Sequence, residues 1–234
     1  MNLLAEVLME NLNNSTEALR KKSIYVMISR TQTGFARLIR RFGKLRYNHA
    51  AIVLDEDFDH IYAVARPKHT GLLLAGIVRE SLDRYVLKKN YDVPIAVFEF
   101  RVSEEEYGRV SEFIKQGLYN PEYLYNIYSV FTTPITGGFA VSKSFSCIEF
   151  VSYILKDLGY LDGKPCKYRP DDFLEIFADK IVYQGDIRGK VSYIPECPTY
   201  YDKLTGKEIG KSIKNYFRIT GRTVAQIFRK KATY

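Results

Sequence analysis

The segment NHAAIVLDEDFDHIYAVARP, residues 48–67, constrains the fold of this chain more than any other stretch. Two apolar runs that contain β-branched residues flank the acidic segment at 55–59, a pattern that predicts two antiparallel strands joined by a turn. With this turn, Leu54 lies opposite His60, and strands over 49–55 and 60–66 form a hairpin. His49 opens the first strand, so the hairpin places an imidazole at one end of a β-sheet.

The remaining hydrophobic periodicities predict an α+β fold with a largely antiparallel sheet packed on helices. Further strands are expected at 23–29 and 93–102, together with a strand pair over 179–194. Helices are expected at 2–12, 16–22, 34–45, 103–119, 147–158 and 211–231, whereas 120–145 predicts a loop or short helix and 195–210 a loop. We therefore expect an N-terminal helical extension over 1–22, a folded domain over 23–194 and a basic C-terminal extension over 195–234.

A cysteine opens the helix that is expected in the segment SFSCIEFVSYILKDLG, residues 144–159. Ser146 and Glu149 have the S-x-x-E spacing of a capping box, which makes Ser146 the N-cap and Cys147 the first helical residue. Unpaired N–H groups and the positive end of the helix dipole favour a thiolate there. The cysteine also begins the apolar stripe of the helix, which continues at Phe150, Val151, Ile154, Leu155 and Leu158. We expect this helix to pack on the sheet with the thiol at the rim of the core.

Cys147 and His49 together point to nucleophilic catalysis. Taken alone, the cysteine also suits a small buried apolar residue, and the histidine a local hydrogen-bonding group. As a pair they supply a helix-capped thiol and a base on a rigid strand, which is what cysteine-histidine catalysis requires. Cys166 and Cys197 adjoin prolines in loops and have neither context.

The composition limits which cellular compartments and which cofactors we expect for this protein. Three cysteines without metal-ligand spacing argue against a disulfide framework, favour a reducing compartment and give no reason to expect a metal or another cofactor. No apolar run approaches the roughly 18 residues of a membrane span. The first residues, MNLLAEVLMENLNN, suit an amphipathic helix better than a signal peptide. We expect a cytoplasmic protein, or one exported without a conventional signal.

The net charge of +8 is concentrated in two segments. Residues 20–46 carry nine lysines and arginines and no acidic residue, and residues 191–234 carry nine against three. These segments predict either solvated surfaces or an anionic partner, which would be a membrane, an acidic substrate or nucleic acid. Nucleic acid is disfavoured because no RNP, zinc-finger or helix-turn-helix signature accompanies the charge. The helix at 34–45 is expected to turn Phe35, Leu38, Ile39 and Phe42 inward and Arg37, Arg40, Arg41 and Lys44 outward.

Two stretches of the chain resemble circularly permuted papain-like hydrolases of the NlpC type, and the YiiX-like group in particular. The strand, turn and helix that in this family precede a histidine-opening strand are similar to ISRTQTGFARLIRRFGKLRYNHAAIVLD, residues 28–55. The helix that opens with the catalytic cysteine is similar to FSCIEFVSYIL, residues 145–155. The resemblance spans about residues 23–160. It implies a permuted papain-like catalytic domain at 23–194, with Cys147 as nucleophile and His49 as base.

The resemblance also suggests which residues border the site. It implies that the site is bordered by Ser29, Arg30, Thr31 and Thr33. Arg30 can hold a carboxylate or phosphate. Thr31 or Thr33 suits the N-cap of the next helix equally well. Tyr123, Tyr125 and Asn126 can wall the cleft or simply pack. The family acts on peptides, amides and acyl lipids, so the substrate class stays open.

An acidic partner for His49 is missing from the expected place in the hairpin. The YiiX-like pattern has a glutamate on the returning strand, where this chain has Ala65, or Arg66 after a register shift of one residue. His60 lies about 16 Å along the strand, at roughly 3.3 Å per residue, which is too far. A backbone carbonyl, Tyr62, Asn48 or a residue from another segment remains as the orienting group. Two function classes follow: a cysteine hydrolase or acyltransferase, and a catalytically degenerate module that binds an anionic partner.

Overall fold

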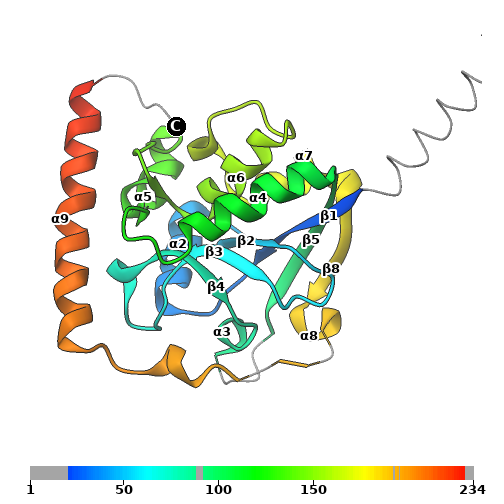
Figure 1. The fold of residues 1–234 in the computed structure, drawn as a ribbon, viewed down its shortest axis with the longest axis horizontal. Helices are drawn as coiled ribbons and strands as arrows, with labels where there is room; N and C mark the ends of the chain where they lie inside the picture. Colours follow the sequence, from blue (N-terminus) through cyan, green and yellow to red (C-terminus); the bar gives the residue numbers. More distant parts are fainter. Residues whose placement is uncertain (1–20, 88–91, 192, 195, 230–234) are drawn as a thin grey trace, which may run out of the picture.

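The computed structural model describes residues 21–87, 92–191, 193–194 and 196–229. Its centre is a six-stranded sheet in the order β4-β3-β2-β1-β5-β8, in which all neighbouring strands are antiparallel (Figure 1). The strands are β1 (Lys22–Ser29), β2 (His49–Val53), β3 (Ile61–Ala65), β4 (Gly76–Glu80), β5 (Pro94–Val102) and β8 (Ile181–Asp186). The α+β class and the antiparallel sheet expected from the sequence are therefore confirmed.

The sheet is buried on both faces, which explains why its central strands are almost continuously apolar. Along β1, Ile24, Val26 and Ile28 enter the larger core. Tyr25 and Met27, which alternate with them, enter a smaller core on the opposite face. This period of two is the geometry of an extended chain between two layers.

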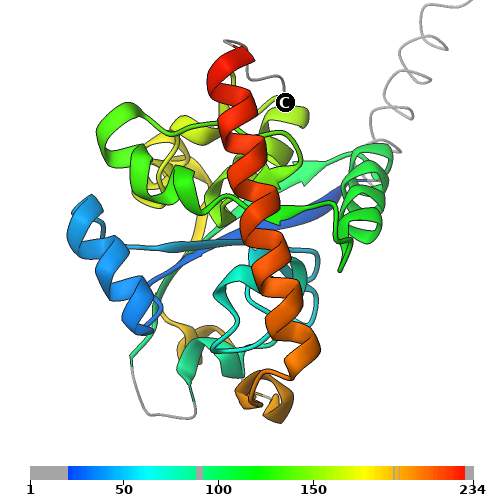
Figure 2. The same ribbon diagram turned by 90° about the vertical axis from the view of Figure 1, so that its left-hand side faces the viewer.

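Helices cover the two faces unequally. The larger core is closed by α4 (Glu104–Gly117), α6 (Cys147–Asp157) and α7 (Phe173–Ile176), and the smaller by α3 (Asp83–Val86) and α8 (Ile187–Lys190). A short parallel pair, β6 (Leu124–Tyr125) and β7 (Ser144–Phe145), flanks α5 (Ile127–Thr136), which packs beside α2 (Gly34–Gly43). The long helix α9 (Gly206–Arg229) runs along one side of the molecule (Figures 1 and 2). Within the described ranges, no helix combines the length and apolarity needed to cross a membrane.

Local sequence signals predicted several elements correctly. The hairpin has the expected register, with Ile52 opposite Tyr62 and a hydrogen bond from the Leu54 N–H to the His60 carbonyl. Capping boxes open both α4 and α6, the latter with Cys147 as its first residue. The cysteine-bearing helix packs on the sheet, as expected.

Other elements differ from expectation. The strand pair expected over 179–194 is wrong: β8 is a single strand, and the Asp186 side chain then accepts a hydrogen bond from the Arg188 N–H and starts α8. Strand β4 was not anticipated. The segment 120–145, expected as a loop or short helix, contains the helix α5, and also the short strands β6 and β7, which were not expected. Helix α9 begins five residues earlier than expected, at Gly206. The helices expected at 2–12 and 16–22 lie outside the described residues, except for Lys21, which is not helical, and Lys22, which belongs to β1.

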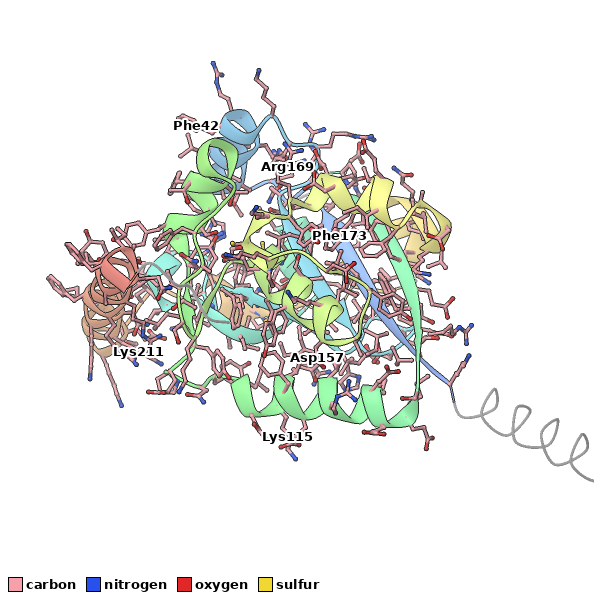
Figure 3. All side chains as sticks on the ribbon, turned by 90° about the horizontal axis from the view of Figure 1, so that it is seen from above. Phe42, Lys115, Asp157, Arg169, Phe173 and Lys211 are labelled. Carbon is pink, nitrogen blue, oxygen red and sulfur yellow. The ribbon has the colours of Figure 1, made fainter. Side chains whose placement is uncertain are left out.

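The expected orientation of α2 is partly wrong. Phe42 is 68% exposed at the outer surface (Figure 3), and Leu38 is also exposed. Arg40 turns inward instead, and donates to the Thr31 carbonyl and, at 2.5 Å, to Asn48 Oδ1. The reason is that α2 lies at the end of the sheet and packs beside α5 rather than on the sheet face.

Two consecutive glycines hold the turn after α5 against the chain beyond α6. Gly137 ends the helix with φ of 73°, and Gly138 follows with φ of 82°, both in the left-handed region. A Cβ on Gly138 would lie 2.0 Å from the carbonyl oxygen of Cys166, whereas a Cβ on Gly137 would meet nothing within 4 Å. Only Gly138 therefore permits the close approach of two backbones.

The two glycines form a matched pair for a stability test. Gly137→Ala should lower the free energy of unfolding by about 1 kcal/mol, the usual penalty for a left-handed alanine. Gly138→Ala has the same penalty plus a backbone clash, and should lower it by about 3 kcal/mol or more. Urea unfolding of both variants measures the difference, and equal losses would contradict the close approach at Gly138.

Candidate active site

The N-terminus of α6 holds Cys147 in a fixed place. The Ser146 N–H donates to Glu149 Oε2 at 2.6 Å, and the Glu149 N–H donates to Ser146 Oγ at 3.3 Å. The second carboxylate oxygen of Glu149 accepts from Ser129 Oγ at 2.8 Å, and from the Asn126 amide at 3.3 Å. A buried carboxylate thus ties the cysteine-bearing turn to the first turn of α5.

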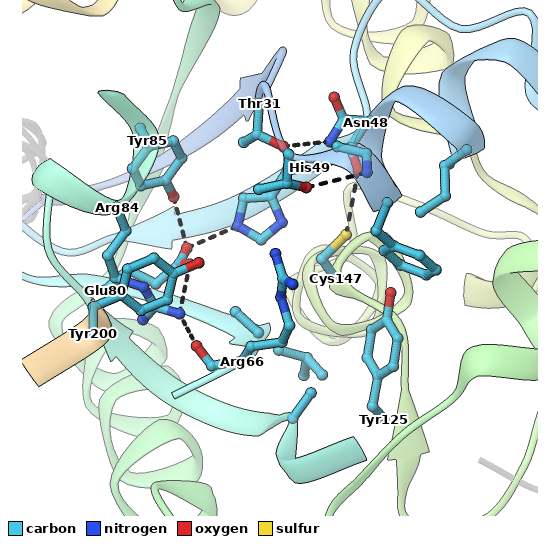
Figure 4. Close-up of a pocket in the computed structure, with 17 residues that line it drawn as sticks. Thr31, Asn48, His49, Arg66, Glu80, Arg84, Tyr85, Tyr125, Cys147 and Tyr200 are labelled. Carbon is cyan, nitrogen blue, oxygen red and sulfur yellow. Dashed lines mark hydrogen bonds and ion pairs between the residues drawn. The ribbon is translucent and has the colours of Figure 1, made fainter. Parts of the chain in front are cut away.

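The neighbouring strand brings His49 to this turn. His49 opens β2 opposite Ser29 of β1, and the carbonyl of the preceding Asn48 lies 3.9 Å from Cys147 Sγ. Both side chains line one cavity, and the Cys147 side chain is close enough to help raise the pKa of His49. The two residues predicted to act together are therefore neighbours in the structure, and Figure 4 shows the imidazole between Glu80 and Cys147.

Glu80, at the end of β4, is the acidic partner that the hairpin lacks. Its Oε2 lies 2.8 Å from His49 Nε2, which leaves Nδ1 of the ring for the thiol. The Tyr85 hydroxyl donates to the same oxygen at 2.6 Å, and Arg84 Nη2 lies 3.7 Å from Oε1 (Figure 4). The described residues thus contain a third polar member of the site, which comes from another segment.

The two hairpin strands separate next to this group. Their ladder contains only the pairs Ile52–Tyr62 and Val53–Ile61, so the expected pairing of His49 with Ala65 does not form. His49 from β2 and Ala65 from β3 instead line a polar cavity of about 80 Å³. The carboxylate of Glu80 lines the same cavity, which explains how a residue of β4 reaches a histidine of β2.

The charges of His49 and Glu80 stabilise each other. Burial disfavours the imidazolium, but the Glu80 carboxylate and the Cys147 side chain outweigh it and raise the pKa of His49 to about 10. Burial likewise disfavours the Glu80 carboxylate, but the charges of His49 and Arg84 and the hydrogen bonds from His49 and Tyr85 lower its pKa to about 2. The imidazolium that a cysteine thiolate requires is therefore favoured near neutral pH.

Cys147 lies where two cavities meet. The polar one is also lined by Thr31, Thr33, Arg66 and Tyr200, and the other is an apolar cavity of about 310 Å³. Residues that line the apolar cavity include Phe42, Leu45, Val130, Phe131, Ile148, Tyr168 and Pro170. Cys147 and Tyr125 line both cavities. A carbonyl group attacked by the sulfur therefore has an apolar cavity on one side and a polar cavity on the other.

The predicted site residues divide into two groups. Tyr125 points toward the sulfur (Figure 4), and burial followed by the charge of Cys147 raises the pKa of its hydroxyl, which therefore stays a hydrogen-bond donor. Thr33 lines the polar cavity and also caps α2, with its Oγ1 accepting from the Ala36 N–H. Ser29 is fully buried behind His49, and Arg30 is exposed beyond the end of β1. Neither lines the two cavities, so the geometry gives them no contact with a ligand there.

The other residues considered have structural roles. Asn126 caps α5 and is fully buried, and Tyr123 packs against the core. His60 pairs with Asp55 at the exposed end of the hairpin. In the described part of the chain, no three histidine, cysteine or acidic side chains are grouped so that they can hold a metal.

Sequence reasoning missed Glu80, Arg84, Tyr85 and Arg66. The available signal was the short apolar run GIVRE at 76–80, which ends in an acid, but it does not reveal which histidine the acid meets. Arg66 is half-buried and donates to the His69 carbonyl at 2.6 Å. It has no ion pair with an acidic residue among the described side chains, so its charge is available to a ligand.

Comparisons with protein-family models, curated proteins and solved structures find no match to this chain.

The substitution Glu80→Gln should remove a pH-dependent part of the stability. The pKa of His49, about 10, lies above its ordinary 6.5, so its contribution is complete below pH 6.5 and is lost as the pH rises through 10. The pKa of Glu80, about 2, lies below its ordinary 4.5, so its contribution is complete above pH 4.5 and is lost as the pH falls through 2. Between about pH 4.5 and 6.5, the free energy of unfolding of the wild type should therefore exceed that of the variant by about 3 kcal/mol, as for other buried ion pairs that lose one partner.

Urea unfolding at about pH 5.5, 8 and 10 measures this stability difference. We expect it to be largest at the lowest of these pH values and to shrink toward the highest. The substitution Glu112→Gln, on the exposed surface of α4, is the matched control and should change stability little at any pH. A difference for Glu80→Gln that does not vary with pH would contradict the ion pair.

The thiols offer a second test. At about pH 6, iodoacetamide should modify Cys147 faster than the half-exposed Cys197, because only Cys147 has an imidazolium beside it. His49→Ala should slow modification of Cys147 about tenfold or more and leave Cys197 unchanged. Peptide mass spectrometry after timed quenching gives each rate. Equal rates at the two cysteines would show that Cys147 is an inert core thiol.

Proposed function

We propose that this protein is a cysteine hydrolase or acyltransferase that acts on an amide, ester or thioester through an acyl-enzyme at Cys147. The observation that carries the proposal is the connected series Cys147–His49–Glu80, in which a helix-capped thiol meets an imidazole held by a buried carboxylate. Such a series supplies a nucleophile, a proton carrier and an orienting group.

The first half of the reaction follows from the positions of these groups. The Cys147 thiolate attacks the carbonyl carbon, and its electron pair forms the new C–S bond as the C=O π electrons move to oxygen. The resulting oxyanion has two donors nearby, the Tyr125 hydroxyl and the Cys147 N–H, which has no intrahelical acceptor in the first turn of α6. When the tetrahedral intermediate collapses, the bond to the leaving group breaks. His49 gives its Nδ1 proton to that group, which leaves a thioester on Cys147.

The second half returns the enzyme to its starting state. Neutral His49 takes a proton from water, or from an acceptor alcohol or amine, as the oxygen or nitrogen attacks the thioester carbonyl. The C–S bond then breaks, and the product acid or the transferred acyl product leaves with the thiolate and imidazolium restored. Glu80 keeps the ring oriented and stabilises its charge throughout, with Tyr85 and Arg84 holding the carboxylate.

The arrangement of the elements supports a permuted papain-like fold. In this chain a strand with the histidine precedes the helix that opens with the cysteine, and that helix packs on an antiparallel sheet. This order is the one the sequence resemblance implies. Glu80 also provides a glutamate, as the family pattern has, although from β4, two strands away from β2, rather than from the expected place on β3.

The two cavities suit a substrate with an apolar group on one side of the reacting carbonyl and a polar or anionic group on the other. An apolar cavity of about 310 Å³ beside the sulfur suits an aliphatic or aromatic group. The polar cavity offers Arg66 to a carboxylate or phosphate. Peptides, simple amides and acyl lipids remain the candidate substrate classes. The alternative is a catalytically degenerate module that binds an anionic partner through its basic segments, and the carboxylate of Glu80 beside His49 favours the enzyme over it.

Model esters test the reaction and the apolar cavity together. With p-nitrophenyl acetate and octanoate, intact-mass spectrometry should detect an acyl adduct on Cys147 that Cys147→Ala lacks. His49→Ala should lower kcat/KM by about 10²-fold or more. The substitution Val130→Trp fills the apolar cavity, and should lower kcat/KM for the octanoate at least about tenfold while sparing the acetate.

The controls separate chemistry from folding. Val182→Trp places the same side chain on the exposed surface of β8 and should leave both kcat/KM values unchanged. An adduct that persists in Cys147→Ala, or turnover by His49→Ala at the wild-type rate, would overturn the proposed mechanism.

A further inference from the structure

The side of helix α9 that packs on the body of the protein is mainly polar, which is unusual for a surface helix. Its inward contacts are mostly polar: Asn215 donates to the Leu73 carbonyl at 3.1 Å, Thr220 bonds the Tyr128 hydroxyl at 2.8 Å, and Glu208 pairs with Lys68 at 3.0 Å. Ile219 is the buried apolar residue of this face, in a small cluster with Leu124 and Val141. A helix that packs on a core normally turns its apolar stripe inward.

Most of the apolar stripe of α9 is left uncovered by the body instead, although Tyr216, Val224 and Ile227 border grooves against α5. Its members recur at helical spacing along one face, and all are exposed: Ile209, Ile213, Tyr216, Phe217, Val224, Ile227 and Phe228. Phe217 is 67% exposed and Phe228 is 83% exposed. Monomeric proteins seldom expose so continuous an apolar surface unless something binds it.

Lysines border this stripe. Lys207, Lys211 and Lys214 are exposed, and none has an acidic partner within the described ranges (Lys211 is labelled in Figure 3). Arg218 and Arg222 lie further round the helix and donate to the carbonyls of Pro121 and Glu122. The one acid of the helix, Glu208, is already occupied by Lys68 and Thr205. The exposed side of α9 is thus apolar and positively charged.

These observations select among the surfaces that can cover α9. A second copy of the chain would bring two lysine-bordered stripes together, which charge repulsion opposes. Nucleic acid would leave the phenylalanines without an apolar partner along most of the stripe. A membrane with anionic lipids satisfies both features, because acyl chains cover the stripe and headgroup phosphates pair with the lysines.

We propose that α9 is an interfacial helix that binds the protein to the surface of an anionic phospholipid membrane. The stripe enters the boundary between headgroups and acyl chains, and Lys207, Lys211 and Lys214 lie at the level of the phosphates. This binding does not depend on the reaction at Cys147.

The apolar surface continues from α9 toward the active site. Tyr216 of α9 and Phe131 of α5 line one groove, and Phe131 also lines the apolar cavity that reaches Cys147. Phe42, which is exposed at the outer surface in Figure 3, and Arg169 also line that cavity. A membrane on α9 therefore adjoins the face on which the cavity opens.

Vesicle co-sedimentation of the full chain tests the proposal. Vesicles of phosphatidylcholine with phosphatidylserine should bind the protein, vesicles of phosphatidylcholine alone should bind it much less, and salt should weaken the binding. Phe217→Ser with Phe228→Ser should reduce the partition coefficient about tenfold or more. Lys211→Gln with Lys214→Gln should reduce it about tenfold on the anionic vesicles only.

Matched controls isolate the helix. Tyr193→Ser removes an equally exposed aromatic residue near α8, and Lys115→Gln removes an exposed lysine on α4, and both should bind as wild type does. Cys147→Ser should also bind normally, which keeps this test separate from the proposed catalysis. Circular dichroism confirms that each variant is folded.

Three results would overturn the proposal. The first is wild-type protein that does not bind anionic vesicles, or binds them as well after the phenylalanines are replaced. The second is a dimer in sedimentation velocity that the Phe217→Ser and Phe228→Ser variant loses, which would make a second copy the occupant. The third is a duplex or single-stranded RNA that binds wild type more tightly than the vesicles do and depends on the same residues.

Discussion

The buried ion pair between His49 and Glu80 is the interaction on which the candidate site depends. Two charges taken out of water are favourable only when their geometry is good and their remaining hydrogen-bonding capacity is used. The protein meets this condition with Tyr85 and Arg84, which both lie in the residues directly after β4 and return to the Glu80 carboxylate. Arg84 is itself held by the Arg66 carbonyl and by the ring of Tyr200, 4.4 Å from its guanidinium carbon. A network of neutral and charged donors thus surrounds one carboxylate, and the carboxylate in turn sets the charge and orientation of the imidazole.

The rest of the fold places the sulfur against this pair. Pairing of β1 with β2 sets His49 at the sheet end, and the Arg40–Asn48–Thr31 contacts anchor the chain that enters β2. Glu149 fixes the opposite side, because one carboxylate closes the cap of α6 and also binds Ser129 and Asn126 of α5. The separation of β2 and β3 then opens the polar cavity inside the sheet, and α2 and α5 enclose the apolar cavity outside it.

Sequence reasoning succeeded where the determinants are local. A capping box is a contact between residues three positions apart, so Ser146 and Glu149 suffice to identify the start of α6 and the place of Cys147. The hairpin register likewise follows from one short turn. Glu80 could not be paired with His49 in this way, because the ladder between β2 and β3 stops after two pairs and alternation along a strand does not reveal that. For α2, the apolar stripe was visible in the sequence, but which side of the helix meets the body depends on tertiary packing. Phe42 is exposed for this reason, although the helical pattern predicted that it faces inward.

The distance along the chain between the members of the site has a consequence for biogenesis. His49 and Glu80 are 31 residues apart, and Cys147 follows Asn48 by 99, so none of the three meets another through local structure. Contacts of such long range form only when the sheet has closed, which is a late event in folding. The sulfur is also synthesised last of the three, after β1, β2, β4 and β5 have left the ribosome in N- to C-terminal order. A nascent or partly unfolded chain therefore has a cysteine without its base and acid. Its thiol meets the imidazole only in the folded molecule, so under the proposed mechanism an unfinished chain carries no activated nucleophile.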